Sequence, residues 1–328
     1  MLSDSVIIVS ALAYMGVLFG IAYYADQRAD AGRSVVANPY IYTLSLAIYC
    51  TAWTFYGSVG LAAKSGADFL PVYLGPTLMA ILFWFVLRRI VRITKVHRIT
   101  SIADFVASRY GKSGLLAGMV TVIVVLGILP YIAIQLKAIA ISFSLLRQYP
   151  AVSMAAAQHP VWADTTFYVA LVLILFAILF GTRHIDNTER HEGMVAAVAF
   201  ESLFKLVAFV AVGAVVTFGV FGGPGDLFRQ AATHPDLAAL MRFEVIPGGY
   251  GGWLSLTFLS MMAFLFLPRQ FQVLVVENVN ETHIRKAIWL FPLYLFLINL
   301  FVLPIALGGR LTFGNGQVDA DMFVLALP

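Results

Sequence analysis

The chain has 328 residues, of which 61% are hydrophobic and only 12% are charged, and its formal net charge is +4. A soluble globular domain has about 45–50% apolar and about 25% charged residues, so this composition excludes a water-soluble fold and predicts an all-α protein that crosses a membrane several times. The small net charge gives no support to a nucleic-acid partner. The single cysteine, Cys50, excludes an intrachain disulfide and a cysteine-based metal cluster.

Apolar runs of about twenty residues, the length that crosses a bilayer, predict eight spans along the chain. They cover approximately residues 5–24, 40–63, 69–87, 114–146, 165–182, 193–221, 251–268 and 287–308. No basic residue precedes the first run, so we expect a retained span rather than a cleaved signal peptide. The chain stops at Pro328, in what reads as a further outside segment or the start of a ninth span, and we expect a fragment of a longer protein.

The loops between these spans differ in their content of lysine and arginine. When successive loops are assigned to alternate sides, fourteen basic residues fall on one side and five on the other, while Lys137 and Lys205 fall within spans. Segment 88–113 alone carries half of the fourteen. Because cytoplasmic loops carry the excess of Lys and Arg, we expect a multi-pass membrane protein with its N-terminus outside the cytoplasm.

The second span has an unusual centre. Residues 39–63 include no charge, but Tyr42, Tyr49 and Tyr56 recur every seven residues and Trp53 follows Tyr49 by four. These aromatic side chains therefore share one helical face. Simple helix packing accounts for such a stripe as well as a binding wall does.

Two glycines and three hydroxyl residues in the same span favour the binding interpretation. They are Gly57 and Gly60, which weaken a helix, and Thr51, Thr54 and Ser58, which can satisfy freed backbone groups. A break in a helix at mid-membrane is tolerated only where it is buried in protein or lines a cavity, and transporters use such breaks to bind substrate and cation. A carbonyl oxygen freed by the break is a hard ligand suited to a small cation.

Three charged residues lie within predicted spans. Glu201 precedes Lys205 by four residues in the sixth span, which is the favourable order for an ion pair on one helical face. Intramembrane ionisable groups usually face a bundle interior and mark a pathway, although a structural pair that neutralises itself is the alternative. Lys137, in the fourth span, either snorkels to the membrane surface or lines a cavity.

No pattern typical of a catalytic site is present. The sequence has no glycine-rich phosphate loop, no nucleophile elbow and no paired catalytic carboxylates. His184 and His191 lack the fixed helical spacing of a metal site, and we interpret them as solvated loop residues. We expect no catalytic residue, no metal centre and no cofactor in this chain.

Three segments resemble the sodium/solute symporter family. They are Thr51-Ala-Trp-Thr-Phe-Tyr-Gly-Ser-Val-Gly60, Thr100-Ser-Ile-Ala-Asp-Phe-Val-Ala-Ser-Arg-Tyr-Gly-Lys-Ser113 and Tyr131-Ile-Ala-Ile-Gln135. Two further segments, 44–57 and 267–278, resemble the branch in which a symporter-like domain is the N-terminal sensor of a bacterial membrane histidine kinase. The resemblance covers essentially the whole chain and implies a multi-pass protein of the bacterial inner membrane.

The resemblance implies a LeuT-type fold, in which one peripheral span precedes two inverted five-helix repeats. Residues 1–38 would hold the peripheral span and its loop, and residues 39–221 the complete first repeat. Residues 222–328 would hold an outside loop and the start of a truncated second repeat.

The resemblance also implies a binding site at the second span. Backbone carbonyls near Ala47 and Cys50 would coordinate a cation such as Na+, with Thr51 beside it. The substrate pocket would be lined by Tyr49, Trp53, Tyr56, Gly57 and Gln135. Some family members carry an aspartate in place of Tyr49, and the loss of that negative charge implies weak sodium coupling or a sensing role here.

Three functions remain open from the sequence. The favoured one is a symporter-like sensor that binds or transports a small organic solute, such as an amino acid or a carboxylate. The signal would pass to a C-terminal kinase module, absent from this chain, that uses ATP and acts on a cytoplasmic response regulator. The alternatives are a stand-alone solute symporter coupled to Na+ or H+, and a membrane scaffold that keeps the fold without transport.

Overall fold

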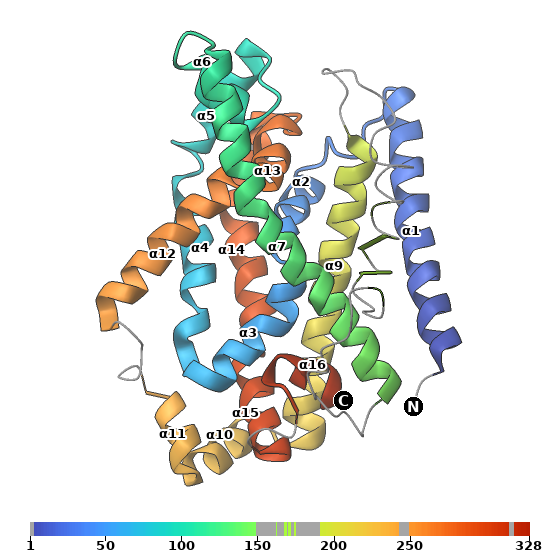
Figure 1. Cartoon of the computed structure of the whole chain (residues 1–328), viewed down its shortest axis with the longest axis vertical. Coiled ribbons are helices and arrows are strands. Elements are labelled where there is room, and N and C mark those ends of the chain that lie inside the picture. The colour runs from blue at the N-terminus through green and yellow to red at the C-terminus, as the bar shows by residue number, and fades with distance from the viewer. Residues whose placement is uncertain are drawn as a thin grey trace.

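The computed structural model describes residues 3–148, 191–242, 249–314 and 318–328. Between residues 148 and 191 it also describes residues 162, 167–168, 170–171 and 174. Among these residues all regular structure is helical, and no strand occurs (Figure 1). The predicted all-α, multi-pass membrane fold is confirmed.

Fifteen α-helices are described within these ranges. They are α1 (Asp4–Asp30), α2 (Pro39–Leu46), α3 (Ala52–Ser65), α4 (Pro71–Leu82), α5 (Leu87–His97), α6 (Ile102–Ser108), α7 (Gly114–Gln148), α9 (Glu192–Ala214), α10 (Pro224–Thr233), α11 (Pro235–Leu240), α12 (Gly249–Phe266), α13 (Pro268–Phe271), α14 (Ile284–Asn299), α15 (Val302–Phe313) and α16 (Phe323–Ala326). Short 3₁₀ turns cover Ala47–Tyr49, Gly66–Phe69, Glu281–His283 and Ala320–Met322, and π-helical turns cover Val215–Val220 and Gln272–Val276.

Most of the predicted spans correspond to observed helices. In the described part of the chain, five helical stretches are long and apolar enough to cross a membrane, or seven if each of two bent helix pairs counts as one span. The bent pairs coincide with the second and third predicted spans: α2 and α3 meet at 54°, and α4 and α5 at 70°. The third predicted span, 69–87, contains a bend that was not expected, because α4 ends at Leu82 and the chain turns into the basic helix α5. The fifth predicted span, 165–182, lies almost wholly outside the described residues.

Local sequence signals explain where several helices begin. Asn38 lies before α2, where its side-chain oxygen accepts a hydrogen bond from the Tyr40 amide at 2.9 Å, and Pro39 occupies the first helical position. Both are favoured at helix N-termini because the first amides have no partner inside the helix. Ser101 caps α6 in the same way.

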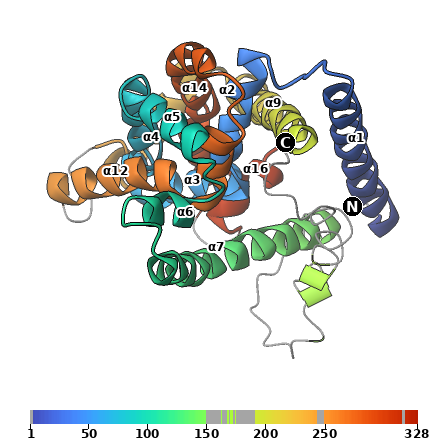
Figure 2. The same ribbon diagram turned by 90° about the horizontal axis from the view of Figure 1, so that it is seen from above.

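The helices form one bundle with its core among α2, α3, α4, α12 and α14 (Figure 1). Phe83, Phe264 and Phe291, from the end of α4, from α12 and from α14, stack with ring centroids 4.9 to 6.4 Å apart. Seen from above, α1 and α12 lie at opposite edges and α7 runs along a third (Figure 2). Helices α1, α7, α9 and α12 expose many large apolar side chains, as expected for surfaces that face lipid.

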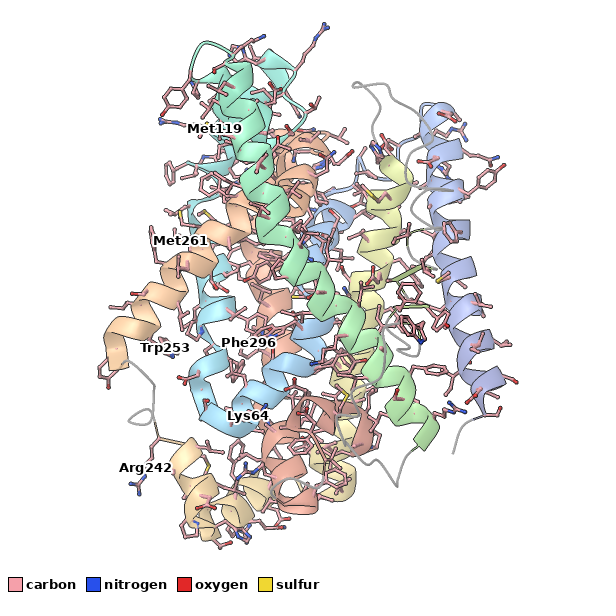
Figure 3. The ribbon with its side chains drawn as sticks, viewed as in Figure 1. Lys64, Met119, Arg242, Trp253, Met261 and Phe296 are labelled. Atoms are coloured by element: carbon pink, nitrogen blue, oxygen red, sulfur yellow. The ribbon has the colours of Figure 1, made fainter. Side chains whose placement is uncertain are left out.

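The described loops lie at the two ends of the bundle. Helices α5 and α6 lie at one end, and α10, α11 and α15 at the other (Figure 1). Lys64 and Arg242 lie at the second end, whereas Met119 marks the start of α7 near the first (Figure 3). The predicted inside and outside loops are thus separated in space within the described residues. Which end faces the cytoplasm stays a prediction.

Candidate functional site

The second span is interrupted in its middle. After the turn Ala47–Tyr49, the backbone of Cys50 (φ −81°, ψ 99°) and of Thr51 (φ −101°, ψ −168°) is extended, and α3 starts at Ala52. The interruption therefore falls at the carbonyls singled out from the sequence. We call residues 47–51 the break.

The predicted ion pair of α9 meets this break. The Lys205 ammonium donates a hydrogen bond to the Cys50 carbonyl oxygen at 2.7 Å, and it lies 3.1 Å from the Glu201 carboxylate. Lys205 is largely buried, with 21% of its side chain exposed, whereas Glu201 is 40% exposed. The pair is therefore more than a self-neutralising helix pair, since it joins α9 to the backbone of the second span.

Two other carbonyls at the break also have donors from the protein. The Ala47 carbonyl accepts the Cys50 amide at 2.9 Å. The Leu46 carbonyl, at the end of α2, accepts the side-chain amide of the fully buried Gln270 at 3.0 Å. Carbonyl groups that lose their partners in a helix need such replacements when they are buried away from water.

The glycines of this span do not interrupt the helix. Gly57 and Gly60 lie inside α3, and their missing side chains let other groups approach. A Cβ atom on Gly57 would lie 2.5 Å from Nε1 of the Trp53 ring, and one on Gly60 would lie 1.6 Å from the Asp321 carboxylate. In this helix glycine serves close packing.

Of the aromatic side chains predicted to line the pocket, Tyr49, Trp53 and Tyr56, the first makes contacts inside the protein. The Tyr49 hydroxyl donates to the Val72 carbonyl at 2.7 Å, and its ring meets Phe264 edge-on at 5.4 Å. Trp53 and Tyr56 are half-buried on α3. Tyr49 thus anchors the break to α4 and α12, while the other two rings keep partly accessible surface.

Helix α7 contributes polar groups to the same region. The Gln135 amide nitrogen and the Tyr131 hydroxyl, one turn apart on α7, are buried and have no hydrogen-bond partner among the described residues. The Arg269 guanidinium lies over the Tyr131 ring, 4.6 Å from its centroid, and both groups are close enough to interact electrostatically with the Tyr49 hydroxyl. The structure therefore brings Tyr49 and the Gln135 turn of α7 toward one region, whereas the Lys137 side chain is exposed.

Three residues of this region were not predicted from the sequence. Gln270 and Arg269 follow the extended residue Leu267 that separates α12 from α13. Tyr294 on α14 donates to the Ser202 carbonyl at 2.9 Å, one turn from Lys205. A glutamine two residues after a proline, at the end of a predicted span, was the available signal, but the sequence does not say which backbone group it meets.

Comparison with known proteins gives two sequence relatives. No family model and no solved structure matches the chain. The chain is 25% identical over 307 residues to a Bacillus subtilis (strain 168) protein named "Uncharacterized symporter YhjB". This alignment covers 92% of this chain and 57% of that protein. It is 33% identical over 89 residues to "Uncharacterized symporter YodF" of the same organism, covering 27% of this chain and 18% of that protein. The chain thus spans little more than half of the first relative, and over nearly all of its own length it is similar to a protein named as a symporter.

Proposed function

We propose that this chain is the solute-binding membrane part of a cation-coupled symporter for a small organic solute. The observation that carries the proposal is the similarity to a protein named as a symporter over 92% of the chain. The break in the second span gives it a physical basis, because irregular backbone at mid-membrane is the usual place for substrate sites in transporters.

The arrangement of two interrupted helices supports a pair of inverted repeats. Helices α2 and α3 run from the α5 end of the bundle to the opposite end, whereas α12 and α13 run the other way (Figure 1). Each is interrupted by extended backbone, and Gln270 joins the two interruptions. In this proposal the first repeat covers residues 39–221, the second begins within 222–328, and the fold is of the LeuT type.

The proposed solute lies between α3 and α7. Trp53 and Tyr56 would cover a planar group or an aliphatic stem, and Gln135 would supply a hydrogen bond. Arg269, beside Tyr131, would attract a carboxylate, which fits an amino acid or an organic acid. Solute binding would favour one arrangement of the two repeats over the other and so couple binding to movement across the membrane.

Uptake by the full-length protein in proteoliposomes tests this function. We expect accumulation of at least one labelled amino acid or carboxylate, driven by an inward gradient of Na+ or of protons. Trp53→Ala and Thr51→Val should each lower this uptake without loss of membrane insertion. Trp289→Ala and Thr121→Val, at exposed positions on α14 and α7, are the matched controls. Absence of uptake for the whole panel, or normal uptake by both site variants, would contradict the proposal.

A sensor role is a second candidate. Segments 44–57 and 267–278 resemble the symporter-like domains of membrane histidine kinases, and this resemblance is what favours it. In that case solute binding would regulate a kinase module in the cytoplasm, and ATP and a response regulator would bind only to that module. The membrane part would lie in the inner membrane with its N-terminus outside the cytoplasm. The coding sequence after residue 328 tests this directly. A phosphoacceptor histidine with an ATP-binding domain would support the sensor, and their absence would remove it.

A further inference from the structure

The Cys50 carbonyl faces a cation that belongs to the protein itself. Lys205 lies in the middle of α9 and directs its ammonium to this oxygen at 2.7 Å. The same ammonium lies 3.1 Å from Glu201, one turn earlier on α9. The ammonium therefore has a hydrogen-bond acceptor at the break and an ion-pair partner on its own helix.

This arrangement does not suit an additional metal ion. Na+ at the Cys50 carbonyl would lie close to the ammonium, and like charges repel strongly where water is scarce. Glu201 already balances the single positive charge of Lys205. The Ala47 and Leu46 carbonyls each already accept a hydrogen bond from the protein, from the Cys50 amide and the Gln270 side chain.

We propose that the Lys205 ammonium is a tethered cation that takes the place of Na+ at the break. It holds the Cys50 carbonyl and fixes the angle between α2 and α3, so that the solute-binding shape of the span forms without sodium. This inference rests on the proposed function and specifies its ion requirement. The negative counter-charge of this tethered cation comes from Glu201 on α9.

Thermal unfolding of the purified full-length protein in detergent tests the proposal. Na+ is titrated against K+ at constant ionic strength, and binding of radioactive ²²Na+ is measured on the same samples. Wild type should show neither sodium-specific stabilisation nor saturable ²²Na+ binding. Lys205→Met should lower the unfolding midpoint by roughly 5 °C, because a buried carbonyl and a carboxylate lose their partner.

Two further variants make the result specific. Lys205→Arg keeps a positive charge with N–H donors and should restore most of the midpoint. Lys137→Met removes a lysine of another spanning helix, α7, whose side chain is exposed, and should leave the midpoint unchanged. If Lys205→Met does not fold, the sodium titrations of wild type and of Lys205→Arg are sufficient to test whether Lys205 replaces Na+.

Two results would overturn the proposal. One is saturable, sodium-specific binding or stabilisation of wild type, and the other is a Lys205→Met protein as stable as wild type. Neither measurement needs a solute, so the outcome is independent of the uptake assay. Lack of uptake would contradict the proposed function without affecting the result on sodium binding. Sodium binding by the wild type would contradict only the proposal that Lys205 replaces Na+.

Discussion

The side chain of Gln270 donates a hydrogen bond to the backbone carbonyl of Leu46 across 3.0 Å, in a place where neither residue is exposed. Gln270 lies on α13, just after the interruption at Leu267, and Leu46 is the last residue of α2. One hydrogen bond therefore joins two interrupted helices that are more than 200 residues apart in sequence. It ties the geometry of one interruption to that of the other.

Removing this hydrogen bond should weaken the fold. Gln270→Met fills a similar volume but leaves the Leu46 carbonyl without its donor, at a cost of about 1–3 kcal/mol for a buried unsatisfied group. We expect a lower midpoint of thermal unfolding in detergent. Gln230→Met, on the exposed face of α10, is the control and should unfold like wild type. Equal stability of the two variants would show that the contact between α13 and α2 contributes little.

The contact between α4 and α12 should depend on Gly75. A Cβ atom there would lie 2.5 Å from the Met261 amide nitrogen and 2.6 Å from the Thr257 carbonyl oxygen, both in the backbone of α12. Backbone atoms of a helix cannot give way without separating the helices, so we expect Gly75→Ala to cost about 1–3 kcal/mol. Thermal unfolding measures the loss.

Gly118→Ala is the matched control for this substitution. It lies on α7, and an added Cβ atom would meet no atom of the described residues within 4 Å. Because alanine is also the better helix former, this variant should be as stable as wild type or slightly more stable. A Gly75→Ala protein with wild-type stability would mean that α4 and α12 are not packed this closely.

Glu281 should hold α5 against the start of α14. Its carboxylate accepts hydrogen bonds from the guanidinium groups of Arg88 and Arg92, with N to O distances of 2.5 to 3.3 Å. Glu281→Gln removes the negative charge, so we expect faster amide hydrogen exchange in α5, and less difference from wild type at high ionic strength.

Asp236→Asn, an exposed carboxylate at the opposite end of the bundle, controls for a general effect of charge. It should leave exchange in α5 unchanged. Unaltered exchange in the Glu281→Gln protein would show that α5 is held by its apolar contacts instead.

The orientation in the membrane is open to a direct test. Lys64→Cys and Arg98→Cys place thiols at opposite ends of the bundle, at exposed positions, while native Cys50 is buried. If the basic end is cytoplasmic, a membrane-impermeant maleimide should label the first variant in intact cells and the second only after lysis. The reverse pattern would invert the predicted topology.

Much of the fold was predictable because hydropathy is a local property. A run of about twenty apolar residues must cross the bilayer wherever it occurs, so most spans were located without knowledge of their neighbours. The turn from α4 into α5 was missed, because the apolar run continues to Leu87 while the helix ends at Leu82. The role of Gly57 and Gly60 was also misread, because a glycine that breaks a helix and one that admits a neighbour look the same in sequence.

The sequence by itself determined that this is a multi-pass helical membrane protein with an interrupted second span and an ion pair within α9. Helical periodicity placed Glu201 and Lys205 on one face. It could not identify the group opposite that face, because the partner, the Cys50 carbonyl, is 155 residues away. Only the packing of α9 against α2 brings the two together. The meeting of ammonium and carbonyl is therefore a property of the tertiary structure, which decides where each buried polar group finds its partner.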